Sequence, residues 1–272
     1  MVLPKALHEP ETRLHTGYFA ACAILVLLVA TYMHEIVSRF AFYRALHRSH
    51  PYYVAESLDK LFGALLCCLA IFAVHRIGMR RIFRELGLAA PVLPALAIAF
   101  LASSPMLIGF ALTRKIAPNP SVPSLLFLVV FSPFVEELEF RGFGFWQLRR
   151  RARWPLWLAI LPPAVLFGLG HVEKGQGWQE VAGIFVLTGT GAAVFSWLLD
   201  RWQNLWAPIG LHIFMNLYWE IFSVSRIAIG GWFPFAVQSA TVVLAIVLTL
   251  FADRHGLLPA RRVAPPSCDA CE

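Results

Sequence analysis

The stretch SLLFLVVFSPFVEELEFRGFGFWQ, residues 124–147, decides how this chain folds. It begins as an apolar run of the kind that crosses a bilayer, and it continues without a turn into three glutamates and an arginine. A charged side chain near the middle of a membrane is costly, and it is usually paired or functional. The stretch therefore predicts a membrane helix whose charged residues pair with one another or take part in the protein's function.

The composition supports a membrane protein. The chain has 272 residues, of which 58% are apolar and 14% are charged, whereas a soluble domain carries about 25% charged residues. Several runs of roughly 17 to 25 residues are nearly free of charge, which is the length that spans a bilayer. The net charge of +7 comes from basic residues in the gaps between these runs, so it does not indicate a nucleic-acid-binding face. We predict an all-α polytopic membrane protein.

The apolar runs predict a bundle of about eight transmembrane helices. We place the spans at roughly 17–37, 58–75, 89–112, 122–148, 154–172, 178–199, 205–226 and 231–252. The first span follows two basic residues, as a signal peptide would, but it ends without a small-residue cleavage site, so we expect it to be retained. The connection 38–57 mixes aromatic and basic residues and is expected to form a short amphipathic helix at the membrane surface.

The distribution of basic residues predicts the orientation. Fourteen Lys and Arg fall on the side that holds both termini, and eight, including Lys60, fall on the other side. Cytoplasmic loops carry the excess of Lys and Arg, so both termini are expected in the cytoplasm, with the protein in the plasma (inner) membrane. The predicted organisation is a cytoplasmic N-terminal segment 1–16, a transmembrane domain 17–252 and a Pro-rich, disordered cytoplasmic tail 253–272. The tail holds Cys268 and Cys271, a lone C-x-x-C that is a weak metal signal.

The charged residues of the fourth span form the first candidate cluster. Glu137 and Arg141 are four residues apart, so they share a helical face and are expected to pair. Glu136 is turned about 100° from Glu137 on a helix and shares Arg141 less easily. A carboxylate in apolar surroundings suits a general base; the alternative is a purely structural ion network. Glu139 faces elsewhere and has no predicted role.

Two further spans carry polar groups. His171 closes the motif FGLGH after Pro162 and Pro163, which are expected to kink the fifth span; the alternative is an interfacial histidine that contacts lipid head groups. His212 and Asn216 are four residues apart, so both point in one direction.

Two such hydrogen-bonding groups suit an oxyanion site, or alternatively a hydrogen bond between helices. Glu220, a turn beyond Asn216, either joins this cluster or reaches the interface. Taken together, Glu136 and His171 are suited to activate a water, and His212 and Asn216 to receive the carbonyl oxygen of a scissile bond.

Three motifs, in order and on three spans, resemble those of the CPBP family of intramembrane proteases. EELEFR fits Glu-Glu-x-x-x-Arg, FGLGH fits Phe-x-x-x-His, and HIFMN fits His-x-x-x-Asn. The family includes the type II CAAX prenyl proteases and bacterial abortive-infection homologues. The resemblance covers residues 124–220, and it implies an eight-helix bundle that encloses a polar catalytic cavity.

The resemblance also implies roles for individual residues. Glu136 would be the general base, His171 would help to hold the water, and two residues would form the oxyanion site. The catalytic set is then Glu136, His171, His212 and Asn216. The residues that support the site are Glu137, Arg141 and Phe167. On a flat drawing of the spans His171 lies near the outer end and His212 nearer the inner end, so a kink or tilt has to bring them together.

The same residues raise the question of a metal. Two histidines and a glutamate can form a zinc site with an open position for water. The sequence lacks H-E-x-x-H, and Asn216 is a poor zinc ligand. We therefore predict a glutamate mechanism without metal or other cofactor, with zinc as the alternative.

The leading functional prediction is an intramembrane endopeptidase whose partner is a membrane protein or a lipidated peptide substrate. One alternative is a non-catalytic membrane scaffold or bacteriocin-immunity-type binding protein of the same fold. The other is a proton-coupled transporter in which Glu136, His171 and His212 form a relay. The sequence leaves open the identity of the substrate, whether it is prenylated, and the oligomeric state.

Overall fold

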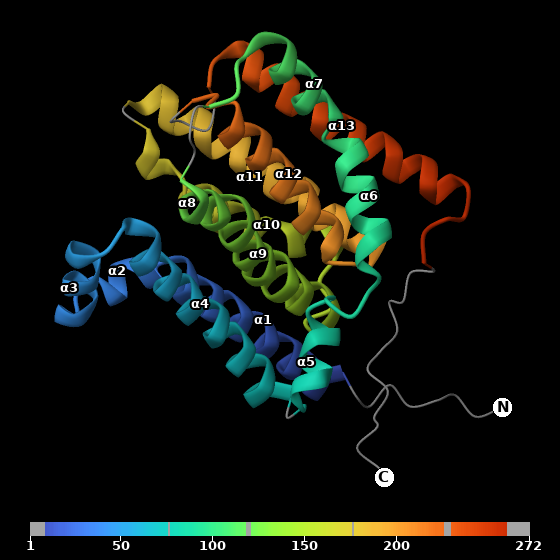
Figure 1. The fold of residues 1–272 in the computed structure, drawn as a ribbon. Coiled ribbons are helices and arrows are strands. Elements are labelled where there is room, and N and C mark those ends of the chain that lie inside the picture. Colours follow the sequence, from blue (N-terminus) through green and yellow to red (C-terminus); the bar gives the residue numbers. More distant parts are fainter. Residues whose placement is uncertain (1–8, 76, 118–120, 176, 226–229, 260–272) are drawn as a thin grey trace.

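The chain is all-helical over the residues that the computed structural model describes, which are 9–75, 77–117, 121–175, 177–225 and 230–259 (Figure 1). In chain order the elements are α1 Glu9–Thr31, α2 Met33–Val37, α3 Ala41–Ser49, α4 Tyr52–His75, α5 Met79–Glu85, α6 Val92–Ala102, α7 Ser104–Thr113, α8 Val122–Leu126, η1 Phe127–Phe131, α9 Ser132–Glu137, η2 Leu138–Phe145, η3 Gln147–Arg151, α10 Leu156–Leu169, η4 Val172–Lys174, α11 Trp178–Trp202, α12 Trp206–Ile221 and α13 Trp232–Arg254. Most of the predicted tail, with Cys268 and Cys271, and the first half of the predicted N-terminal segment lie outside the described residues.

Each of the eight predicted spans coincides with a helix or a run of helices. Among the described residues, three helices are long and apolar enough to cross a membrane, namely α4, α11 and α13. The pair α6 and α7, which is bent by 45° at a short break, would make a fourth. The apolar part of α1 and the whole of α10 are shorter. Within the described residues, the fold is thus that of an integral multi-pass membrane protein, and the number of eight spans stays a prediction.

The two faces of helix α4 differ in polarity. Its exposed side carries an apolar stripe at helical spacing, with about half of each side chain open to the surroundings: Leu61, Leu65, Leu69 and Phe72. The opposite side carries Lys60, Gly63 and the fully buried Cys67. An apolar stripe on the outside is what lipid requires, so the polar and small residues of α4 turn toward the bundle.

The fourth helical segment, residues 122–151, lies at the centre of the bundle. It comprises α8, η1, α9, η2 and η3, and helices α1 and α4 pack on one side of it while α10, α11 and α12 pack on the others (Figure 1). The segments η1, η2 and η3 are π-helical, with each amide bonded five residues back instead of four. Such turns are rare and are often found at functional sites. The charged residues of the stretch 124–147 thus lie on a helical segment that other helices surround.

Two glycines let this central helix approach its neighbours. A Cβ added at Gly144 would lie 2.7 Å from Cδ2 of Leu27 in α1. A Cβ at Gly142 would lie 2.9 Å from Cδ2 of Leu205 and 3.1 Å from the carbonyl oxygen of Leu86. Interiors packed this closely have no room for an extra methyl group, so both positions require glycine.

The short amphipathic helix predicted in the connection 38–57 is confirmed as α3. Its one buried residue, Tyr43, is 1% exposed. The hydroxyl of Tyr43 donates a hydrogen bond of 2.7 Å to Oδ2 of Asp59 on α4, and Nδ1 of His34 on α2 lies 2.9 Å from the same oxygen. This cluster anchors α3 to the end of α4.

Candidate active site

The carboxylate of Glu136 is held on one of its two oxygens. Ser132, one turn earlier in α9, donates a hydrogen bond of 2.7 Å to Oε1. Nζ of Lys60, on α4, lies 2.9 Å from the same oxygen and forms an ion pair with it. The second oxygen, Oε2, lies 3.9 Å from Nε2 of His212, which is too long for a direct hydrogen bond. Glu136 therefore has one oxygen fixed by its neighbours and one that faces a histidine.

Glu137 orients that histidine. Its side chain is fully buried, and Oε1 lies 3.1 Å from Nη1 of Arg141, so the ion pair expected from their spacing is confirmed. The same oxygen lies 2.8 Å from Nδ1 of His212. An ionised carboxylate only accepts hydrogen bonds, so Nδ1 of His212 carries the proton in this contact. The other ring nitrogen, Nε2, is thereby turned toward Glu136.

Aromatic rings surround the guanidinium of Arg141, which is 1% exposed. Its Cζ lies 4.5 Å from the ring centre of Phe167 and 5.4 Å from that of Phe195. The ring of Phe195 in turn lies 5.9 Å from that of His212. Cations favour aromatic faces, and an apolar surrounding strengthens the ion pair between Arg141 and Glu137. These rings explain how a guanidinium remains buried at the centre of the bundle.

His171 follows directly after α10. The helix continues through Pro162 and Pro163 and ends at Leu169. Nδ1 of His171 lies 2.8 Å from the carbonyl oxygen of Phe167. A carbonyl only accepts, so Nδ1 is the donor and Nε2 is the acceptor atom of the neutral ring.

His171 and His212 lie near each other in the folded chain. The ring of Phe167 lies 4.5 Å from the ring of His171 and 6.4 Å from that of His212. Both histidines are also close enough to Glu136 to interact electrostatically with its carboxylate. A flat drawing of the spans places the two histidines at different depths in the membrane. In the folded chain they lie in the same site.

Asn216 lies one turn after His212 on α12. Its Nδ2 donates a hydrogen bond of 3.0 Å to the carbonyl oxygen of Leu128 in η1. An asparagine amide has two N–H donors, so one donor remains beyond this bond. Among the described residues Asn216 makes its hydrogen bond to this backbone group rather than to His212, and its part in an oxyanion site stays a prediction.

Part of the chain matches a known protein family. Residues 118–218 match the family model described as type II CAAX prenyl endopeptidase Rce1-like. The chain carries an Rce1-like domain of the CPBP family. None of the curated proteins matches the chain. The Rce1-like domain contains all seven predicted site residues and runs from just before α8 nearly to the end of α12.

Lys60 is the site residue that the sequence reasoning missed, and it lies outside the Rce1-like domain. The predicted span 58–75 already contained it, but we counted it with the basic residues of the outer side and gave it no role in the site. Helix α4 begins earlier than that span, at Tyr52, and Lys60 lies two turns inside it. The signal was its spacing from Gly63 and Cys67, which puts all three on the face opposite the leucine stripe.

Glu139 points away from the Rce1-like site residues toward α4, as its position on the helix predicts. It is 6% exposed. A Cβ added at Gly63 would collide with its Oε1, so the missing side chain at Gly63 makes room for the carboxyl group. Glu220 lies one turn beyond Asn216 on α12, and no role follows from its position.

The site residues include histidine and glutamate, the side chains that a zinc site would need. Across the described part of the chain, no three His, Cys, Asp or Glu side chains form a group that would hold a metal ion. In the Rce1-like domain Nδ1 of His212 is already bonded to Glu137 and Nδ1 of His171 to a backbone carbonyl. A histidine that binds a metal through Nε2 makes this same kind of bond from Nδ1, so these contacts do not decide between the two mechanisms. We derive no step through a metal.

Proposed function

We propose that the protein is an intramembrane endopeptidase that hydrolyses a peptide bond with a water activated by Glu136. The observation that carries the proposal is the geometry around Glu136. Its Oε1 is fixed by Ser132 and Lys60, and its Oε2 faces Nε2 of His212 at 3.9 Å. A water beside that pair of atoms is within hydrogen-bond reach of both. The Rce1-like match of residues 118–218 supports the same activity.

In the proposed reaction Glu136 acts as the general base. The ammonium group of Lys60 favours the ionised carboxylate, which is the form that accepts a proton. His171, which interacts electrostatically with the same carboxylate, helps to orient the water. The water oxygen attacks the carbonyl carbon of the substrate while its proton passes to Oε2 of Glu136.

The negative charge that forms on the substrate oxygen needs donors. His212 can donate from Nε2 when its ring carries a proton on both nitrogens, and the buried carboxylate of Glu137 stabilises that charged ring. Asn216 supplies its remaining N–H. Removal of one such donor typically lowers kcat by about 100- to 1,000-fold.

The tetrahedral intermediate then collapses. Glu136 returns the proton to the leaving nitrogen, the carbon–nitrogen bond breaks, and the products are a new carboxyl end and a new amino end. Glu136 is ionised again and is ready for the next water. One carboxylate therefore serves as base and then as acid, so protons and charge balance over the cycle without another reagent.

The proposed substrate is a lipidated or otherwise membrane-associated protein, and the family description points to a prenylated one. The proposed setting is an eight-span bundle in the plasma membrane with both termini in the cytoplasm. An apolar outer surface at α4 and a polar interior at Glu136 suit a substrate that reaches the site from the bilayer.

Cleavage of prenylated and unprenylated fluorogenic peptides by the purified protein in detergent tests the proposal. We expect Glu136→Gln to abolish cleavage and Glu35→Gln, a change at an exposed carboxylate on α2, to leave it intact. A strong zinc chelator should not alter the wild-type rate.

Three results would count against parts of this proposal. Equal cleavage by wild type and Glu136→Gln would remove Glu136 from the chemistry. Loss of activity with the chelator and recovery with added zinc would overturn the metal-free mechanism. Proton-coupled flux in liposomes that depends on Glu136, with no peptide cleaved, would favour the transporter.

A further inference from the structure

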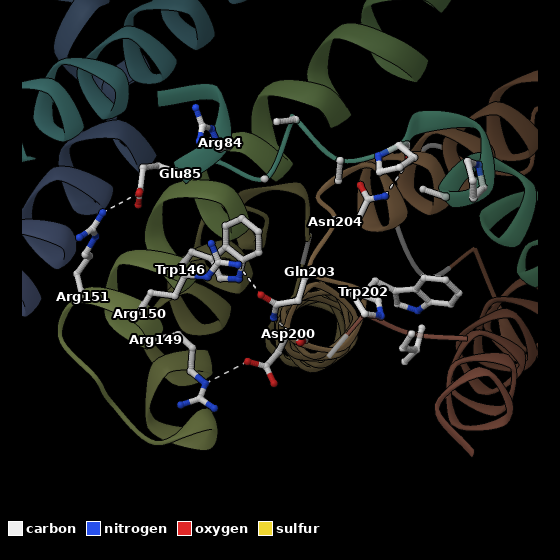
Figure 2. Close-up of a pocket in the computed structure, with 18 of the residues that line it drawn as sticks. Arg84, Glu85, Trp146, Arg149, Arg150, Arg151, Asp200, Trp202, Gln203 and Asn204 are labelled. Atoms are coloured by element: carbon white, nitrogen blue, oxygen red, sulfur yellow. Dashed lines mark hydrogen bonds and ion pairs between the residues drawn. The ribbon is translucent and has the colours of Figure 1, made fainter. Parts of the chain in front are cut away.

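A cavity of about 1190 Å³ opens at the end of the bundle where α5, η3 and α11 meet (Figure 2). It is larger than the roughly 300–1,000 Å³ of common small-molecule pockets. Five arginines line it, namely Arg84, Arg149, Arg150, Arg151 and Arg153. Two carboxylates, Glu85 and Asp200, are the acidic residues of the lining. The cavity is thus strongly cationic, and it lies far from Glu136 along the central helical segment.

Both carboxylates are already paired. Nε of Arg149 lies 3.1 Å from Oδ1 of Asp200, and Nη2 of Arg151 lies 2.7 Å from Oε1 of Glu85 (Figure 2). Arg150 donates to the side-chain oxygen of Gln203, and its guanidinium lies 3.5 Å from the ring centre of Trp146. These contacts hold three guanidinium groups in place, which leaves no acidic side chain of the lining to neutralise the others.

The remaining two arginines are unneutralised. Arg84 and Arg153 are exposed, and across the described residues neither has an ion-pair partner. Arginine is the side chain best suited to bind phosphate, because its planar group presents several parallel donors. The surplus of positive charge therefore fits a phosphate-bearing ligand.

Hydrogen bonds between two loops hold the wall of the cavity together. The backbone amide of Leu205 donates to the carbonyl oxygen of Gly87 at 3.2 Å, and Nε1 of Trp206 donates to that of Leu88 at 3.0 Å. Nδ2 of Asn204 donates to the carbonyl oxygen of Pro91 at 2.8 Å. These bonds tie the loop after α5 to the turn between α11 and α12. A wall fixed in advance lowers the entropy cost of binding.

The surroundings of the cavity are those of a membrane interface. Trp146 and Trp202 line it, and tryptophan gathers where hydrocarbon meets water. Part of the lining is apolar, with Pro94, Ala95 and Leu257. The excess of Lys and Arg on this side marks it as cytoplasmic. A ligand that matches the site has a phosphate head and an apolar body.

We propose that this cavity binds the head group of an anionic glycerophospholipid of the cytoplasmic leaflet. The phosphate would contact Arg84 and Arg153, and the acyl chains would lie along the apolar side of the cavity. Basic pockets between helices on the cytoplasmic side suit such head groups. This inference stands independently of the proposed protease activity.

Thermal unfolding of the purified full-length protein in neutral detergent tests the inference, with added phosphatidylglycerol, phosphatidylcholine or inorganic phosphate. We expect phosphatidylglycerol to raise the Tm of the wild type by several degrees more than phosphatidylcholine does. The double substitution Arg84→Gln and Arg153→Gln should reduce that difference by at least half. The control, Arg39→Gln with Arg48→Gln, removes the same charge from exposed positions at the other end and should keep it.

The other outcomes would overturn the proposal. An equal loss in both double variants would indicate unspecific surface charge. An equal Tm shift from inorganic phosphate would indicate a site for free anions, and an equal shift from a soluble peptide with a free carboxyl end would indicate a peptide site. Native mass spectrometry of the wild type checks the result without substitutions, because a specific site retains phosphatidylglycerol over an excess of phosphatidylcholine.

Discussion

Nζ of Lys60 lies 2.9 Å from Oε1 of Glu136, and this ion pair joins α4 to the central helical segment. The two residues are 76 positions apart in the chain. Lys60 lies outside the Rce1-like domain and Glu136 lies within it. The candidate site is therefore completed by a helix that the domain match does not include.

Lys60→Met is expected to weaken both stability and activity. A hydrogen bond between charged groups contributes about 1.5–3 kcal/mol, and the change leaves the partly buried carboxylate of Glu136 without its cation. We expect the free energy of unfolding to fall by about 2 kcal/mol on that basis, and kcat to fall as well. Lys60→Arg, which keeps the charge, should retain part of both. Unchanged kcat in Lys60→Met would show that the ion pair does not support the base.

Glu137→Gln is expected to lower kcat by about 10- to 100-fold, by analogy with the loss of a group that orients a metal-bound histidine. The amide no longer stabilises a charged ring at His212, although its oxygen can still accept from Nδ1. Substrate binding should change little, so KM should stay near its wild-type value. The measurement is steady-state cleavage of the peptide substrate. A rise in KM at constant kcat would place Glu137 in substrate binding instead.

Gly144→Ala is expected to destabilise the bundle by about 1–3 kcal/mol, the usual cost of overpacking. The new Cβ would lie 2.7 Å from Cδ2 of Leu27 and 3.3 Å from the carbonyl oxygen of Glu139. Gly191→Ala in α11 is the matched control, because nothing lies within 4 Å of its added Cβ. The control should be neutral or gain up to about 1 kcal/mol from helix propensity. Thermal unfolding in detergent compares the two, and an equal loss in both would contradict the packing argument.

Tyr43→Phe is expected to cost about 1–3 kcal/mol, because it leaves the buried carboxylate of Asp59 without one of its donors. The ring and its packing remain, so the change isolates the hydroxyl. Burial, together with the nearby carboxylate of Asp59, raises the pKa of Tyr43 well above its ordinary value, so the hydroxyl stays a donor throughout the usable pH range. Stability that depends on this bond should therefore show no loss as the pH rises from 7 to 9. Unfolding midpoints of the two proteins across that range provide the measurement.

Much of the fold could be predicted from apolar runs. The runs place all eight helical segments, because lipid requires apolar side chains wherever a helix meets it. The predicted span starts at residue 58 whereas α4 starts at Tyr52, since the charged residues Glu56, Asp59 and Lys60 weaken the apolar signal at that end. These charges are compensated by residues on other helices, as Tyr43 does for Asp59, and a single span does not reveal such partners.

The candidate site was predicted only in part. The spacing of Glu137 and Arg141 gave their ion pair, because both residues lie on one helix. The contact between Glu137 and His212 was not foreseen, since it joins two helices whose mutual rotation depends on packing. The hydrogen bond from Asn216 to the carbonyl oxygen of Leu128 in η1 was not foreseen either, since it also joins two helices.

The π-helical turns also determine which sequence changes the central helix tolerates. A π turn holds one residue more than the α turn it replaces, so removal of one residue from η1 would restore ordinary α-helical bonding. Because the π turn takes up its extra residue within one turn, the residues on either side would keep their phase around the helix axis. Leu128 lies in that turn, so its carbonyl oxygen would lose the position from which it accepts the hydrogen bond of Asn216. A one-residue deletion in η1 is thus expected to disturb the contact with Asn216 while Glu136 keeps its orientation, and relatives that keep this contact are expected to keep the length of η1.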